Sequence, residues 1–159
     1  MSFPYSSRQI REIAEAEKVL RHPDILKPGD PIPFRKYGDN GKRMDLLLDL
    51  VDGPALLDLK FHVRAPVFDN PETYEAALLL TGVRVRGIGW HATGKRRFYK
   101  QMIPKGWHQN VIDPNLPSGH DDYNRHLPLA SFRPTDLADF FTKAAAMWHI
   151  DLKFQEGLL

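Results

Sequence analysis

Two neighbouring stretches in which polar and apolar residues alternate constrain the fold of this chain more than any other feature. They cover residues 43–51 and 56–64, and Asp52-Gly53-Pro54 separates them. The apolar positions are Met44, Leu46, Leu48, Leu50, Leu57, Leu59, Phe61 and Val63. The polar positions are Asp45, Asp49, Asp58, Lys60, His62 and Arg64. A period of two is typical of a strand with one buried face, and Asp-Gly is typical of a tight turn, so we predict a β-hairpin. A helix over residues 44–50 is the alternative for the first stretch, although it would scatter the leucines.

A second hairpin is predicted further along the chain. Residues 76–90 begin with an apolar run and continue as a strand, residues 91–95 form the turn, and residues 97–103 form the returning strand. Because side chains alternate along a strand, Arg84 and Arg86 should lie on the same face. Consecutive strands tend to be neighbours, so the two hairpins predict an antiparallel meander.

Each end of the chain has a predicted helix. Residues 7–21 have an apolar stripe and begin with a capping-box pattern, and residues 134–148 have apolar side chains at spacings of three and four. A short strand over residues 150–155 follows the second helix. Breaker-rich segments at 23–42 and 104–132 are expected to be irregular. The predicted fold class is α+β: an antiparallel sheet of four or five strands in a meander with an N-terminal and a C-terminal helix, in a single domain spanning residues 1–159.

Length and composition exclude several classes of protein. The chain has 159 residues, enough for one compact domain, and it has no cysteine. A disulfide framework, a thiolate nucleophile and a cysteine-ligated metal site are therefore excluded. No apolar run approaches the roughly 20 residues that cross a bilayer, and the first residues lack the apolar core of a signal peptide. We expect a cytoplasmic protein with no membrane partner.

Basic residues are concentrated in one part of the chain. The sequence has no acidic residue between Glu75 and Asp113, although its net charge is only +2. We expect the following side chains to bind phosphate: Arg84, Arg86, Lys95, Arg96, Arg97 and Lys100. Such a charged segment attracts a nucleic acid, an acidic protein surface or a small anion, and the alternative is a solvated hairpin whose acids lie on neighbouring elements. Four aromatic residues in this region could stack on bases or belong to the core: Trp90, Phe98, Tyr99 and Trp107. Gly87 and Gly89 indicate a bulge or a close approach by another group.

Three histidines lie in the long segment 104–132, among three aspartates. His108, His120 and His126 are candidates for acid–base catalysis, because the pKa of imidazole is near neutral. Phosphodiester cleavage also needs a cation beside the non-bridging oxygens, which Arg84, Arg86 or Arg125 could supply. The histidine spacing matches no established metal motif, so we expect no metal and no cofactor. Zinc bound by these histidines and Asp122 is one alternative, and purely structural hydrogen bonding is another.

The C-terminal half resembles a family of small uncharacterised bacterial and prophage proteins over residues 85–152. The residues that carry the resemblance are Trp107-His108-Gln109-Asn110, Asp113, His120, His126-Leu127-Pro128-Leu129 and the helix Leu137–Trp148. The chain departs from the family pattern at Asp121-Asp122-Tyr123, where a closely spaced histidine pair is expected. The resemblance implies a strand, a histidine-bearing loop and a terminal helix in a mobile-element context, and it implies no reaction.

These features predict a small protein that interacts with RNA and cleaves it without a metal, as compact RNase-type toxins do. Two alternatives remain open. The first is a non-enzymatic protein–protein interaction module in a phage or host-defence context, which needs the basic residues but not the histidines. The second is a metal-dependent hydrolase that uses the histidines and Asp122. All three depend on how the basic and histidine-bearing segments are placed in space.

Overall fold

The computed structural model describes residues 3–27, 29–37, 41–52, 55–67, 74–91, 95–96, 102–103, 105–111 and 125–152. The first half of the chain contains α1 (Ser7–Glu15), β1 (Lys18–Leu20), the 3-10 helix η1 (Pro23–Ile25), β2 (Arg35–Tyr37), β3 (Arg43–Asp52), β4 (Ala55–Pro66) and β5 (Glu75–Leu80). The second half contains β6 (Val83–His91), β7 (Lys95–Arg96), β8 (Met102–Ile103), β9 (Gly106–Val111), β10 (Arg125–Pro128), α2 (Leu137–Met147) and β11 (Ile150–Asp151).

The fold is α+β, with a mostly antiparallel sheet and two α-helices in the described part of the chain. The main sheet has nine strands, in the order β10-β9-β6-β5-β4-β3-β1-β11 with β2 beside β3. The prediction of four or five strands is therefore wrong. Most of the additional strands are short, and they lie in segments whose prolines and glycines favoured irregular structure. The prediction of a meander is confirmed in the central part, where β3, β4, β5 and β6 pair in succession and β9 and β10 continue the series.

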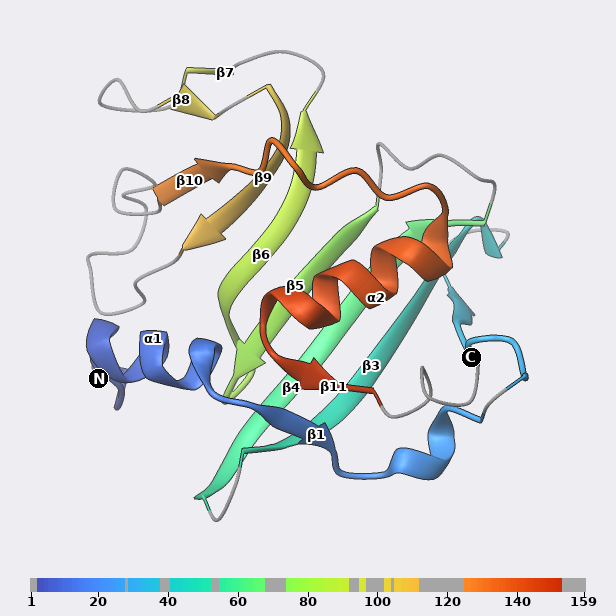
Figure 1. Ribbon diagram of the computed structural model, residues 1–159, viewed down its shortest axis with the longest axis horizontal. Helices are drawn as coiled ribbons and strands as arrows, with labels where there is room; N and C mark the ends of the chain where they lie inside the picture. Colours follow the sequence, from blue (N-terminus) through green and yellow to red (C-terminus); the bar gives the residue numbers. More distant parts are fainter. Residues whose placement is uncertain are drawn as a thin grey trace.

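The predicted hairpin of β3 and β4 is confirmed and provides the centre of the core. Leu48 pairs with Phe61, and both are almost completely buried. Helix α2 lies across β3, β4 and β5 (Figure 1), and the ring of Phe141 packs 5.7 Å from that of Phe61. Trp148, just after the helix, packs edge-on against Phe61 at 5.9 Å. This face, which we call the inner face, is therefore covered by aromatic and aliphatic side chains.

Residues 76–90 form two strands rather than the predicted single strand. Thr81 and Gly82 both have positive φ angles, 48° and 78°, and they join β5 to β6 in a tight turn. Paired positive φ angles are typical of the two-residue turn whose twist matches antiparallel strands. The partner of β6 on its other side is β9, so β9 and β10 lie within the segment expected to be irregular. Of the predicted returning strand 97–103, residues 102–103 form β8, which pairs with β7, and residues 97–101 lie outside the described residues.

The two arginines of β6 lie on opposite faces of the sheet, which contradicts the predicted shared face. Leu79 pairs with Arg84 and Leu78 pairs with Arg86, so Val85 is an extra residue in a β-bulge. A bulge shifts the alternation of side chains by one position. Arg86 is therefore on the inner face and only 7% exposed, whereas Arg84 is exposed on the other face.

Helix α1 ends at Glu15, six residues before the predicted end at residue 21. The reason is Lys18, which begins β1 and is fully buried. Its ammonium group donates to the carbonyl oxygens of Ala14 at 3.0 Å, Ala16 at 2.6 Å and Trp148 at 2.7 Å. A cation at the carboxyl ends of two helices satisfies carbonyls that have no partner within the helix. The predicted capping box at Ser6 and Gln9 is confirmed.

The C-terminal helix is confirmed, with Asp136 as its N-cap. The strand that follows it, β11, pairs in parallel with β1 and ends at Asp151, before Leu152, and residues 153–155 of the predicted strand lie outside the described residues. Within the part of the chain that the structure describes, no helix is long and apolar enough to cross a membrane.

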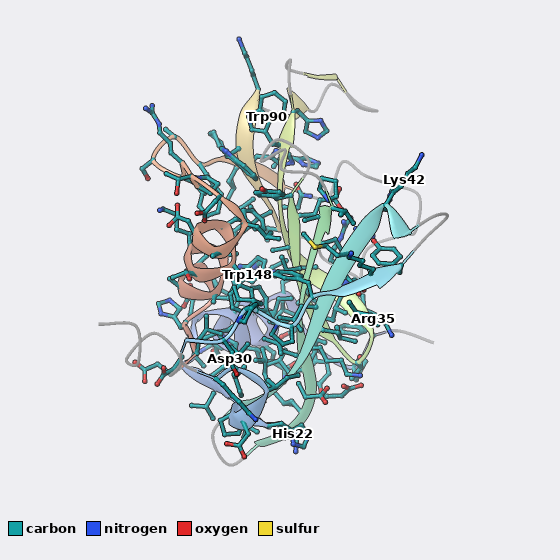
Figure 2. The ribbon with its side chains drawn as sticks, turned by 90° about the vertical axis from the view of Figure 1, so that its right-hand side faces the viewer. His22, Asp30, Arg35, Lys42, Trp90 and Trp148 are labelled. Carbon is teal, nitrogen blue, oxygen red and sulfur yellow. The ribbon has the colours of Figure 1, made fainter. Side chains whose placement is uncertain are left out.

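The second face of the sheet, which we call the outer face, is covered by neither of the described helices. In Figure 2, which views the sheet close to edge-on, α2 lies to one side of the strands. The buried residues of α1 belong to the same core cluster as those of α2. The outer face carries polar side chains, including the aspartates of β3 and the alternate residues of β4, as the period-two pattern predicted.

Candidate functional site

A cavity of about 230 Å³ lies on the outer face of β4, β5, β6 and β9. The strand register explains its shape. His62 of β4 pairs with Ala77, Ala77 with Gly87, and Gly87 with Asn110 of β9. The two middle positions carry little or no side chain, so the long side chains of β4 and β9 form two walls above a floor of small residues.

The floor is made by glycines whose missing side chains, rather than unusual backbone angles, create the space. Neither Gly87 nor Gly89 is among the described glycines with positive φ. A Cβ atom at Gly89 would lie 3.7 Å from Cε1 and 3.8 Å from Nε2 of His108. At Gly87 it would lie 3.6 Å from Nδ2 of Asn110. A methyl group at either glycine would therefore make ordinary van der Waals contact with a β9 side chain, so the absence of a Cβ leaves space beside His108 and Asn110.

His108 is the most strongly perturbed titratable group of this site. It lines the cavity but is only 2% exposed, and its Nδ1 lies 3.4 Å from the carbonyl oxygen of Gly106. Burial is the main reason that the pKa of His108 falls to about 4, and the neighbouring His91 and His126 lower it further. A neutral ring that donates from Nδ1 has its lone pair on Nε2, so His108 has the form of a proton acceptor at neutral pH.

Two further imidazole rings lie beside His108. The ring of His91, at the end of β6, stacks on His108 with centroids 4.8 Å apart and an interplanar angle of 18°. The ring of His126, on β10, lies 5.8 Å from His108. Nδ1 of His126 donates to Oδ1 of Asn110 at 2.7 Å, which fixes its orientation. A group held in this way is suited to proton transfer at a defined position.

A further imidazole borders the cavity from the β4 wall. Nε2 of His62 donates to Oδ2 of Asp45 at 2.9 Å, and both side chains are partly buried. Arg35 lies 3.6 Å from the same carboxylate. Next to His62 along β4, Arg64 pairs with Glu75 at 2.6 Å at the rim of the cavity. The histidines of both walls therefore have charged or hydrogen-bonded neighbours.

The structure brings together some of the residues predicted from the sequence and separates others. His108 and Arg84 line the same cavity, and His126 contacts His108. Arg86 lines a separate cavity near α1 with Gln109 and Trp148, and its guanidinium donates to the carbonyl of Val85. The backbones of Lys95 and Arg96 form β7, next in the chain after His91. Several predicted residues or their side chains lie outside the described residues: His120, Asp122, Arg97, Lys100, and the side chains of Lys95, Arg96 and Arg125.

The aromatic candidates divide in a similar way. Trp107 packs 5.2 Å from Phe132 and 5.4 Å from Phe140, so it belongs to the core and not to a base-stacking surface. Trp90 is half-buried and is among the residues around the cavity. Phe98 and Tyr99 lie outside the described residues.

Three residues of the site were not predicted from the sequence: His62, Asp45 and His91. Asp45 and His62 were both predicted to lie on the polar face of the hairpin. That shared face indicated that their side chains could form a hydrogen bond. His91 was assigned to a turn, whereas it ends β6 and pairs with Gly106. Across the described residues, no group of three or more histidine, aspartate or glutamate side chains is arranged to hold a metal ion.

Comparison with known proteins adds no relative, since no family model, no curated protein and no solved structure matches this chain.

Proposed function

We propose that this protein binds single-stranded RNA and cleaves its phosphodiester bonds by metal-independent acid–base chemistry at the outer-face cavity. The observation that carries the proposal is the position of His108. This imidazole is neutral at physiological pH and shares the cavity with the exposed side chain of Arg84. A proton acceptor and a cation are two of the groups that such cleavage requires.

The proposed chemistry begins at the ribose. Nε2 of His108 accepts the proton of the 2′-hydroxyl group, and the resulting oxygen attacks the adjacent phosphorus. The guanidinium of Arg84 faces the non-bridging oxygens, where negative charge increases during the attack. The 2′-hydroxyl is the nucleophile, so the substrate is RNA rather than DNA.

Binding is supported by the basic residues that follow β6 in the sequence. The chain leaves β6 at His91 and enters the β7–β8 hairpin, which lies beyond the end of β6 (Figure 1). The segment from residue 95 to 105 contains five basic residues and no acid: Lys95, Arg96, Arg97, Lys100 and Lys105. Basic residues in this part of the sequence would hold the phosphates that flank the cleaved bond.

Two measurements test the proposal. Binding of a fluorescent single-stranded RNA should be detectable at about 50 mM salt and fall steeply by about 200 mM, because counterions are released. Cleavage of that RNA should persist in excess chelator and should fall by about 10²–10⁴-fold in His108→Gln. Absence of binding at low salt would overturn the proposal.

The alternatives predict different results. A non-enzymatic interaction module would show no RNA turnover in the wild-type protein and would keep its binding when His108, His120 and His126 are all replaced by alanine. A metal-dependent hydrolase would lose activity in chelator and would contain a stoichiometric metal on elemental analysis.

A further inference from the structure

The two walls of the outer-face cavity each carry an imidazole, and the two imidazoles have different surroundings. His108, on the β9 wall, lies among two other imidazoles and a backbone carbonyl. His62, on the β4 wall, is held by the carboxylate of Asp45. The first environment favours a neutral ring, and the second orients the ring of His62 through a hydrogen bond to a carboxylate.

The distance between the walls fits a group bound between them. β5 and β6 separate β4 from β9. Three strand spacings correspond to about 14 Å between the main chains, from which both side chains project into the same cavity. The floor between the walls is Ala77, Gly87 and Gly89, and the side chain of Arg84 lies over Gly87, where its guanidinium can meet a phosphate bound between the imidazoles.

We propose that His62 is the proton donor to the leaving group, positioned by Asp45, in the RNA cleavage proposed above. His108 Nε2 removes the 2′-hydroxyl proton, the O2′–P bond forms and the P–O5′ bond breaks. The departing O5′ takes a proton from Nδ1 of His62. The products are a 2′,3′-cyclic phosphate and a free 5′-hydroxyl group, His108 gains one proton, and His62 loses one. This inference rests on the proposed function, and it adds a catalytic residue, His62, and a positioning residue, Asp45.

The local charges are consistent with these roles. Nε2 of His62 is used by Asp45, which leaves Nδ1 as the ring nitrogen that can face a substrate. Arg35 also approaches Asp45, but its side chain is 79% exposed, so solvent weakens its effect on His62. Arg64 is paired with Glu75, which limits its repulsion of a protonated ring.

The test compares two substrates that differ only in the leaving group. One is a dinucleoside monophosphate, whose 5′-alkoxide must be protonated as it leaves. The other is the 4-nitrophenyl ester of the same nucleoside 3′-phosphate, whose leaving group is stable without a proton. The nucleoside is the one that the wild-type protein cleaves fastest in a set of four dinucleotides.

His62→Gln should lower cleavage of the dinucleotide by about 10²–10³-fold and cleavage of the nitrophenyl ester by less than about tenfold. Asp45→Asn should show the same selective loss on a smaller scale, because the carboxylate acts through His62. His108→Gln should lower cleavage of both substrates, since both need a base. His22→Gln is the matched control: His22 is exposed and lies at the opposite end of the molecule from Trp90 (Figure 2), and this variant should cleave both substrates at wild-type rates.

The outcomes separate the two proposals. If the wild-type protein cleaves both substrates and His62→Gln is equally active on both, or equally impaired on both, then His62 is not the leaving-group donor, while the proposed function stands. If the wild-type protein cleaves neither substrate, both proposals are overturned. Thermal melting of each variant shows whether a loss reflects unfolding.

Discussion

The two faces of the main sheet are made from the same strands but differ in the polarity of their side chains. The inner face is apolar, and α2 and Trp148 fill the space above it with aromatic rings. The outer face is polar, and its central positions are glycine and alanine. Burial of apolar area stabilises the first face, whereas the second leaves a cavity lined with titratable groups. The face that stabilises the fold and the face that carries the candidate chemistry are therefore separated by the thickness of one sheet.

The largest change in stability is expected when an aromatic ring is removed from the inner face. Phe141 is fully buried against Phe34 and Phe61, so Phe141→Ala should reduce the free energy of unfolding by about 3–5 kcal/mol. Leu47, on the outer side of β3, is 46% exposed, and Leu47→Ala should change stability by less than about 0.5 kcal/mol. Urea denaturation measures both values. Similar losses in the two variants would contradict the assignment of faces.

A second test uses the titration of His108. Its pKa is about 4 in the folded protein and near 6.5 in an unfolded chain, so between these values the unfolded state binds more protons. Acidification through this window should therefore destabilise the fold, by about 2 kcal/mol between pH 7 and pH 4.5. In His108→Gln this contribution should be missing, so the stability of the variant should fall less over the same range. Equal pH dependence in the two proteins would show that His108 titrates normally.

The two arginines of β6 provide a paired test. Arg86→Gln removes a buried guanidinium from the inner face and should cost about 1–3 kcal/mol in urea denaturation, with little direct effect on RNA binding. Arg84→Gln should leave stability unchanged and reduce the slope of log affinity against log salt by about one. The reverse pattern would place the bulge at Val85 in doubt.

The smallest expected effect concerns the cavity floor. In Gly89→Ala the new methyl group meets only the ring edge of His108 at ordinary contact distance, so stability should change by less than about 0.5 kcal/mol. The methyl group covers the Nε2 edge, and RNA cleavage should fall by about tenfold. Gly87→Ala places its methyl group against Asn110 and Arg84 instead of His108, so a loss of cleavage in that variant would report on Arg84 and not on Nε2 of His108. Cleavage at the wild-type rate in Gly89→Ala would show that Nε2 of His108 is not approached from this side.

The inner face could be predicted from the sequence because it depends on local periodicity. The alternation in β3 and β4 identifies the strands, the pairing and the buried side without knowledge of distant residues. Helix α2 was predicted for the same reason. The end of α1 was not, because it depends on a contact between Lys18 and Trp148, which lie far apart in the sequence.

The candidate site could be predicted only in part, since it depends on register. One extra residue at Val85 decides that Arg84, and not Arg86, shares a face with the histidines. The predicted cluster included His108 and His126 because they are close in the sequence. His62 and His91 belong to strands β4 and β6, and only the order of strands brings them to the same cavity.

The parallel pairing of β1 with β11 has a consequence for folding while the chain is being synthesised. Lys18 pairs with Ile150, so β1 can complete this pairing only after the chain has been synthesised as far as residue 150. Until then, one edge of β1 is open and the ammonium of Lys18 has not reached the carbonyl of Trp148. A nascent chain arrested before that point would expose an unfinished sheet edge, which makes premature termination a hazard for aggregation and for chaperone capture.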